Sequence, residues 1–74
     1  MNLKDARTQK LLSVRRLAEA AGVAPATIYH IEHERTSPSF RAIRDISAAL
    51  EMDPLDIDEF AAVIEGTGAG KAAA

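Results

Sequence analysis

The segment 13–31 constrains the fold more than any other part of this chain, because it holds the end signal of one helix and the start signal of the next. Ser13 belongs to the residue types that cap helix N-termini, and apolar side chains at helical spacing follow it. Gly22 can adopt the left-handed conformation that ends a helix, and Pro25 suits the first position of a new one. The segment therefore predicts two short helices joined by a tight turn.

The second of these predicted helices has apolar side chains on one face only. Ile28 and Ile31 are three residues apart and are expected to point inward. Small or hydrogen-bonding side chains are left for the outer faces, namely Ala26, Thr27, Tyr29, His30 and His33. A helix that exposes such groups and is braced by a neighbouring helix can enter a groove of DNA. We therefore interpret 13–31 as a DNA-binding helix-turn-helix.

Apolar spacing elsewhere in the chain predicts three further helices, at about residues 3–11, 40–50 and 54–65. The core-facing side chains that we expect in the first two of these are Leu3, Ala6, Leu11, Phe40, Ile43, Ile46, Ala49 and Leu50. The last helix is capped by Asp53, begins with Pro54 and stops at Gly66. No alternating run of β-branched residues is present, so the sequence predicts an all-α, five-helix bundle that contains a helix-turn-helix.

The chain has 74 residues, which is the size of a single small domain. We expect this domain to cover residues 1–65, and we expect residues 66–74, made mostly of Gly and Ala, to form a flexible tail or linker. There is no cysteine, which excludes disulfides and thiolate metal sites and fits a reducing compartment. No apolar run approaches the roughly 20 residues needed to cross a bilayer, and the N-terminus lacks the pattern of a secretion signal. The sequence therefore predicts a cytoplasmic protein with no membrane partner.

The formal net charge is −2, but the charge is divided unevenly along the chain. Residues 1–44 carry eight Lys and Arg against four Asp and Glu, whereas residues 45–74 carry one Lys against seven acids, so the two parts have net charges of +4 and −6. This layout suits a protein with a basic face toward phosphate groups and an acidic face turned away. Small domains often divide their charge in this way, so the asymmetry supports a nucleic-acid partner only weakly.

Several short motifs keep one register along most of the chain. They are Leu12-Ser13, Leu17-Ala18-Glu19, Gly22-Val23, Thr27-Ile28, Ile31-Glu32, Pro38-Ser39, Ile46, Ala49-Leu50 and Asp53-Pro54. In these motifs the sequence from about residue 3 to residue 57 resembles the Xre/Cro family of helix-turn-helix domains, which has the five-helix fold of phage repressors. The resemblance implies a sequence-specific DNA-binding transcriptional regulator, which we expect to be a repressor, although the family also includes controller proteins and antitoxins.

The resemblance also implies roles for individual residues of the second motif helix. Contacts to base edges are expected from Pro25, Ala26, Tyr29 and His30, and Thr27 matches a position that contacts a phosphate. Proline and alanine offer only carbon atoms, which can pack on thymine methyl groups. Polar recognition of bases therefore depends on few side chains, and we expect modest intrinsic specificity.

Charged residues and one serine complete the predicted set, in part through the resemblance. Glu32 matches an acid that pairs with an arginine of the first helix, and Arg7 stands at the corresponding place, so an Arg7–Glu32 ion pair is expected. The alternative is two separately solvated charges. Further phosphate contacts are expected from Arg15, Arg16, Arg35, Ser39 and Arg41. Many family members have a phosphate-binding Gln where this chain has Val14, and Arg15 or Arg16 can replace that contact.

The apolar residues of 54–65 cover more than one face of their predicted helix. One explanation is that Phe60, Val63 and Ile64 contact a second copy, in a homodimer that binds an inverted repeat with half-sites about one helical turn apart. The other explanation is that Phe60 and Ile64 complete the core of a single copy. The same helix suggests a competing function, a protein-interaction module such as an antitoxin or controller partner. DNA binding would differ from it in a steep loss of affinity with salt.

Other polar clusters point to no chemistry of their own. His30 and His33 are three residues apart with Glu34 nearby, but no third strong zinc ligand is indicated, so we expect no metal and no cofactor. The acids within 53–59 lack the glycine and the closing glutamate of a calcium loop. The serines lack the glycine elbow of a nucleophile, and no catalytic triad order is present, so we do not expect an enzyme.

Overall fold

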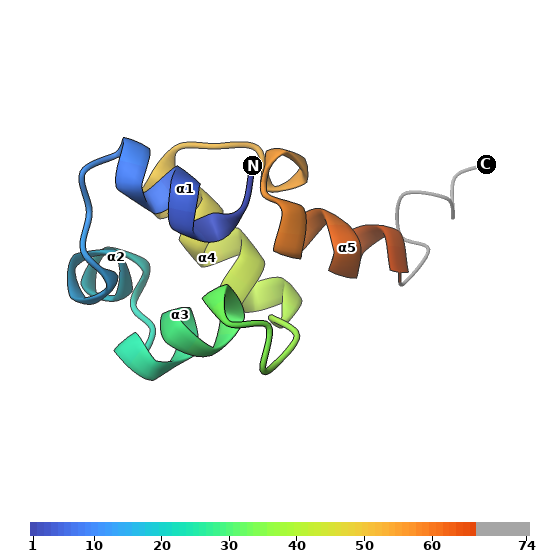
Figure 1. The fold of residues 1–74 in the computed structure, drawn as a ribbon, viewed down its shortest axis with the longest axis horizontal. Helices are drawn as coiled ribbons and strands as arrows, with labels where there is room; N and C mark the ends of the chain where they lie inside the picture. The colour runs from blue at the N-terminus through green and yellow to red at the C-terminus, as the bar shows by residue number, and fades with distance from the viewer. Residues whose placement is uncertain (67–74) are drawn as a thin grey trace.

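The computed structural model of the chain describes residues 1–66, which form five α-helices and one short 3₁₀ helix, with no strand among them. The elements are α1 (Leu3–Gln9), α2 (Val14–Ala21), α3 (Pro25–Glu32), α4 (Phe40–Leu50), the 3₁₀ helix η1 (Pro54–Asp56) and α5 (Asp58–Gly66) (Figure 1). The predicted all-α class with five α-helices is thus confirmed. The predicted tail, apart from Gly66, lies outside the described residues.

Side-chain caps explain where three of the helices begin. Three helices are each preceded by a capping residue, which is Asn2, Ser13 or Ser39. The side chain of each capping residue accepts a hydrogen bond from a first-turn amide of its helix, at 2.8–3.1 Å. These bonds satisfy amides that have no partner inside the helix. Helix α3 has no such cap and begins with Pro25, which has no amide hydrogen to satisfy. Gly22 ends α2 with φ +72°, as the sequence predicts.

The core is aliphatic except for one aromatic ring. Its fully buried members with large side chains are Leu3, Leu17, Ile28, Ile31, Ile46, Leu50, Ile57 and Phe60. They come from all five α-helices and from the turn between η1 and α5, so the core joins the whole described chain. Burial of these side chains from water supplies the main stabilising free energy.

Helix α1 ends at Gln9, and the prediction that it continues to Leu11 with this side chain inside is wrong. Leu11 has φ +59° and is 92% exposed. The turn is closed by the Leu12 amide, which donates to the carbonyl of Arg7 at 3.1 Å. Because the chain reverses at Leu11, the side chain of Leu12 reaches the core in its place.

Phe40 is also not where the periodicity places it, since this residue is 55% exposed. It is the first residue of α4, and side chains in a helix lean toward the N-terminus. Phe40 therefore points past the end of the core. The buried face of α4 is formed by Ala42, Ile43, Ile46, Ser47 and Leu50.

The predicted single helix over 54–65 is divided into η1 and α5. Ile57 lies between them in an extended conformation, with φ −107° and ψ 118°, and its side chain is completely buried. Phe60 is completely buried as well. The proposal that Phe60 contacts a second copy is therefore wrong, because its ring completes the core of a single copy.

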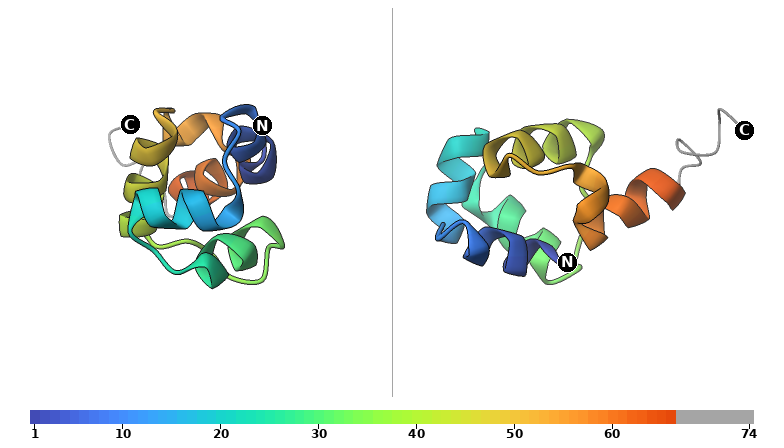
Figure 2. Two further views of the ribbon diagram at one scale, coloured as in Figure 1. Left: turned by 90° about the vertical axis from the view of Figure 1, so that its left-hand side faces the viewer. Right: turned by 90° about the horizontal axis from the view of Figure 1, so that it is seen from above.

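Helix α5 extends away from the bundle formed by α1 to α4, with its first turn next to the start of the chain (Figure 2). The Asp58 amide donates to the carbonyl of Met1 at 2.7 Å. The Leu3 amide donates to a carboxylate oxygen of Glu59 at 2.8 Å. Hydrogen bonds from backbone amides therefore link the start of the chain to the first turn of α5.

The ion pair expected between Arg7 and Glu32 is present and links α1 to the last residue of α3. The Arg7 Nε and Nη2 atoms donate to the two Glu32 carboxylate oxygens at 2.7 and 3.2 Å, and Nη1 donates to the carbonyl of Leu12 at 2.9 Å. The two side chains are only 14% and 5% exposed. This burial excludes the alternative of two separately solvated charges.

Reversing the charge of Glu32 tests this pair. Glu32→Lys leaves Arg7 beside a like charge in a partly buried position, which we expect to cost about 3 kcal/mol of unfolding free energy. In a domain of this size, that loss lowers the melting temperature by roughly 10–20 °C in a thermal scan followed by circular dichroism. Glu34→Lys makes the same change at an exposed neighbour and should shift the melting temperature by only a few degrees. Equal shifts in the two variants would show that the pair does not brace α3.

Candidate nucleic-acid interface

Helix α3 presents one face that no other helix covers. It lies along the lower side of the molecule in Figure 1 and in the left panel of Figure 2, with α2 next to it. Ile28 and Ile31 anchor its inner face in the core, where they are 0% and 1% exposed. The outer face is therefore open to a partner while the helix is held firmly from behind.

The predicted base-contacting residues share this outer face. Pro25, Ala26 and Tyr29 are exposed, and His30 is partly exposed, as is the predicted phosphate contact Thr27. Tyr29 is 45% exposed and is therefore accessible to solvent. The structure thus brings together on one short helix the residues that the sequence assigns to base recognition.

Tyr29 is not isolated on this surface. Its ring stacks on that of His33, with ring centroids 3.9 Å apart and planes 26° apart, and it meets His30 edge to face at 6.1 Å and 68°. The Nδ1 atom of His33 lies 2.8 Å from the Tyr29 carbonyl oxygen. Because a carbonyl oxygen only accepts hydrogen bonds, Nδ1 carries the hydrogen in this contact. The sequence pattern places His33 on the outer face, toward DNA or solvent, but does not indicate this stack; the spacing of four residues from Tyr29 is the signal that could have shown it.

Three of the predicted phosphate contacts are available cations. Arg15 and Arg16, at the start of α2, and Arg35, just after α3, are exposed, and within residues 1–66 their guanidinium groups have no ion-pair partner. Arg41 differs, because its Nε atom lies 3.8 Å from a carboxylate oxygen of Asp45. Its side chain is 85% exposed, so water weakens this attraction and leaves the charge accessible.

Ser39 is exposed, but its side-chain oxygen already has a structural function. That oxygen accepts the amide hydrogen of Ala42 at 3.1 Å and caps α4. A hydroxyl that accepts one bond can still donate its own hydrogen. The cap therefore leaves the hydroxyl hydrogen for an anion.

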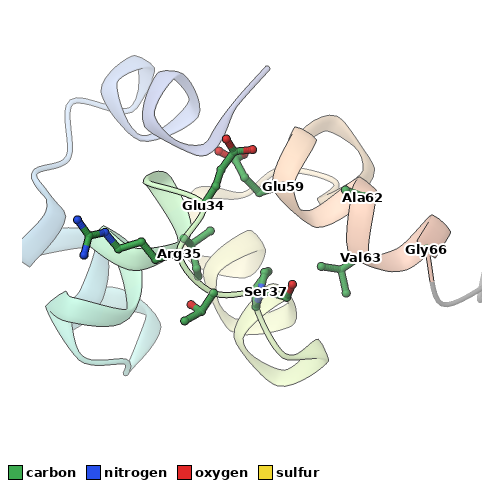
Figure 3. Close-up of a pocket in the computed structure, with 10 residues that line it drawn as sticks. Glu34, Arg35, Ser37, Glu59, Ala62, Val63 and Gly66 are labelled. Carbon is green, nitrogen blue, oxygen red and sulfur yellow. The ribbon is translucent and has the colours of Figure 1, made fainter.

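A hollow of about 500 Å³ lies past the C-terminal end of α3, between the segment that follows this helix and helix α5 (Figure 3). The carboxylates of Glu34 and Glu59 point toward one another at one edge of the hollow, and Ala62 and Val63 line it from α5. The guanidinium group of Arg35 extends away from these two acids. The acidic edge would repel phosphate, so we expect phosphate groups on the side of this segment toward which Arg35 extends.

Two further features are absent from the part of the chain that the structure describes. Among residues 1–66 there is no group of three or more His, Cys, Asp or Glu side chains that could hold a metal ion. In the same part of the chain, no helix combines the length and the apolar character needed to span a membrane.

A family model described as helix-turn-helix matches residues 3–57 of the chain. The chain belongs to the Xre/Cro-like helix-turn-helix family. Neither a search of curated proteins nor a search of solved structures found a match. Members of this family are DNA-binding regulators and are not typically enzymes, so the protein is a DNA-binding helix-turn-helix regulator. The matched span ends before α5, and the match does not favour the competing function of a protein-interaction module that binds through this helix.

Proposed function

We propose that this helix-turn-helix protein is a transcriptional repressor that binds a specific double-stranded DNA sequence as a homodimer, with α3 in the major groove. The observation that carries the proposal is the two-sided character of α3. Its inner face is completely buried, and its outer face carries the exposed ring of Tyr29 beside His30. A rigid helix with exposed polar and aromatic side chains is the element that helix-turn-helix proteins insert into DNA.

The outer face of α3 offers two kinds of base contact. Tyr29 and His30 can form hydrogen bonds with base edges, whereas Pro25 and Ala26 can pack on thymine methyl groups. Only two of these four side chains have polar atoms, so the protein would recognise few bases directly. Additional discrimination would come from DNA shape and from the use of two half-sites.

Phosphate groups on either side of the major groove would be held by the residues around α3. Arg15, Arg16 and Arg35 are cations without an ion-pair partner in the part of the chain that the structure describes. Thr27, Ser39 and Arg41 would add further contacts. Such contacts fix the register of the protein on the duplex and carry little sequence information.

Paired arginine and histidine variants test DNA binding and the division of roles. In an electrophoretic shift assay on fragments from the upstream region of its own gene, Arg15→Ala with Arg16→Ala should weaken binding to every sequence. It should also flatten the plot of log affinity against log salt by about two units, because two fewer counterions are released. His30→Ala should leave this slope unchanged and reduce the preference for the specific site.

Glu19→Ala is a matched control for the arginine pair, because it removes an exposed charge from the same helix without removing a cation. If neither the double variant nor His30→Ala alters the shifts, the proposed DNA interface is wrong. Binding that tolerates high salt would instead support the protein-interaction module.

The homodimer would form through the exposed parts of α5. Val63 and Ile64 are only partly buried, and they face different hollows. Val63 lines the hollow next to Glu34, whereas Ile64 lines an apolar groove with Phe40 and Met52. A second copy that covers these side chains would remove apolar surface from water and give the two-fold symmetry that an inverted repeat requires.

A charge introduced at Val63 tests this contact. Val63→Asp should shift the protein from dimer to monomer in sedimentation velocity and weaken binding to a two-fold symmetric site at least tenfold. Because Val63 also packs on the core, Ala62→Asp supplies a second test at an exposed neighbour that lines the same hollow. Leu11→Asp, at a 92% exposed position on the α1–α2 turn, is the control. A dimer that persists in both α5 variants would place the interface elsewhere.

A further inference from the structure

The His33 ring is held against Tyr29 by a ring stack and by a hydrogen bond to the backbone. The rings overlap face to face, with centroids 3.9 Å apart. His33 is the C-cap residue of α3, and its backbone amide donates to the Tyr29 carbonyl at 3.0 Å. Its ring Nδ1 donates to the same carbonyl at 2.8 Å. The imidazole ring is therefore fixed to the backbone of the residue whose side chain it covers.

The stack leaves Tyr29 open in the direction that a base contact needs. Side chains in a helix lean toward the N-terminus, so His33 covers Tyr29 from the C-terminal side. The side of the ring toward Ala26, in the first turn of α3, is not covered by His33. His30 meets the same ring at its edge, with the planes 68° apart. Two imidazoles thus limit the orientations of the Tyr29 ring while almost half of its surface stays exposed.

A restrained ring has a defined benefit in recognition. An exposed tyrosine samples several rotamers, and binding in one of them costs side-chain entropy. Aromatic pairs in favourable geometry stabilise one arrangement before the partner arrives. The lower entropy cost strengthens binding to the base sequence that this ring orientation fits, and it does not strengthen binding to other sequences.

We propose that His33 is a positioning residue, which holds the Tyr29 ring in one orientation for a base contact and so increases sequence discrimination without contacting a base itself. This inference rests on the proposed insertion of α3 into the major groove. It assigns to the end of α3 a role in specificity that is separate from the phosphate contacts of Arg35 two residues later.

The first test needs no DNA, because Tyr29 is the only tyrosine and the chain has no tryptophan. Intrinsic tyrosine fluorescence therefore reports on this one ring. His33→Ala should increase quenching by acrylamide and lower the fluorescence anisotropy, since the ring loses its cover. His33→Phe keeps a ring that can stack but lacks the hydrogen bond, and should restore most of the protection. Unchanged quenching in His33→Ala would overturn the stack as a restraint in solution.

The second test measures the ratio of dissociation constants for a scrambled and a selected DNA site, the latter obtained by selection from random sequences. His33→Ala should lower this ratio about two- to tenfold, with little change in affinity for the scrambled site. His33→Phe should recover most of the ratio. Adding His33→Ala to Tyr29→Ala should change nothing further, because the positioned ring is already absent.

The remaining outcomes separate the possible failures. An equal loss of affinity for both sites in His33→Ala would make His33 a phosphate contact and overturn the positioning role. A lower melting temperature in His33→Ala that His33→Phe does not correct would make it a structural residue. If the unaltered protein binds no DNA while the fluorescence results hold, the stack is real but the proposed function fails.

Discussion

The bidentate pair between Arg7 and Glu32 is the interaction on which the position of α3 depends. A helix of eight residues is too short to be stable alone in water, so tertiary contacts must hold it. The inner face supplies apolar contacts, which are strong but not directional. The buried Glu32 carboxylate sets the position more closely, because any shift of α3 would leave a charge unpaired where water cannot replace its partner. Arg7 also donates to the Leu12 carbonyl, so one guanidinium group fixes α1, the following turn and α3 together.

Much of the fold could be predicted from the sequence, because caps, glycine and apolar spacing act locally. Gly22, Ser13 and Ser39 mark helix ends through interactions with atoms a few residues away. The errors lie where a distant contact decides. Leu11 has the spacing of a core residue but lies on a reversed turn, and the buried side chain of Ile57 needs an extended backbone that interrupts the predicted last helix. Apolar spacing cannot indicate these departures, because a prediction from spacing requires the helix to continue through the residues in question.

The candidate site shows the same division between local and non-local information. Residue types and register placed Tyr29 and His30 on the outer face of α3, and the arginines near it. The stack of His33 on Tyr29 depends on the conformation at the helix end, where φ and ψ leave helical values. Distant contacts also decide whether an apolar residue of the last helix packs in the core or contacts a partner. Phe60 is buried in the core because α5 packs beside the start of the chain. The sequence pattern does not indicate this packing.

The hydrogen bond from the Leu3 amide to Glu59 has a consequence for biosynthesis. Its acceptor is 56 residues away, so the amide is translated long before the carboxylate that satisfies it. The nascent chain can form the local turns of α2 and α3 early, but the Leu3 amide lacks this acceptor until α5 has emerged from the ribosome. Emergence of α5, and not synthesis of the recognition helix, would therefore complete the contacts of the first turn of α1.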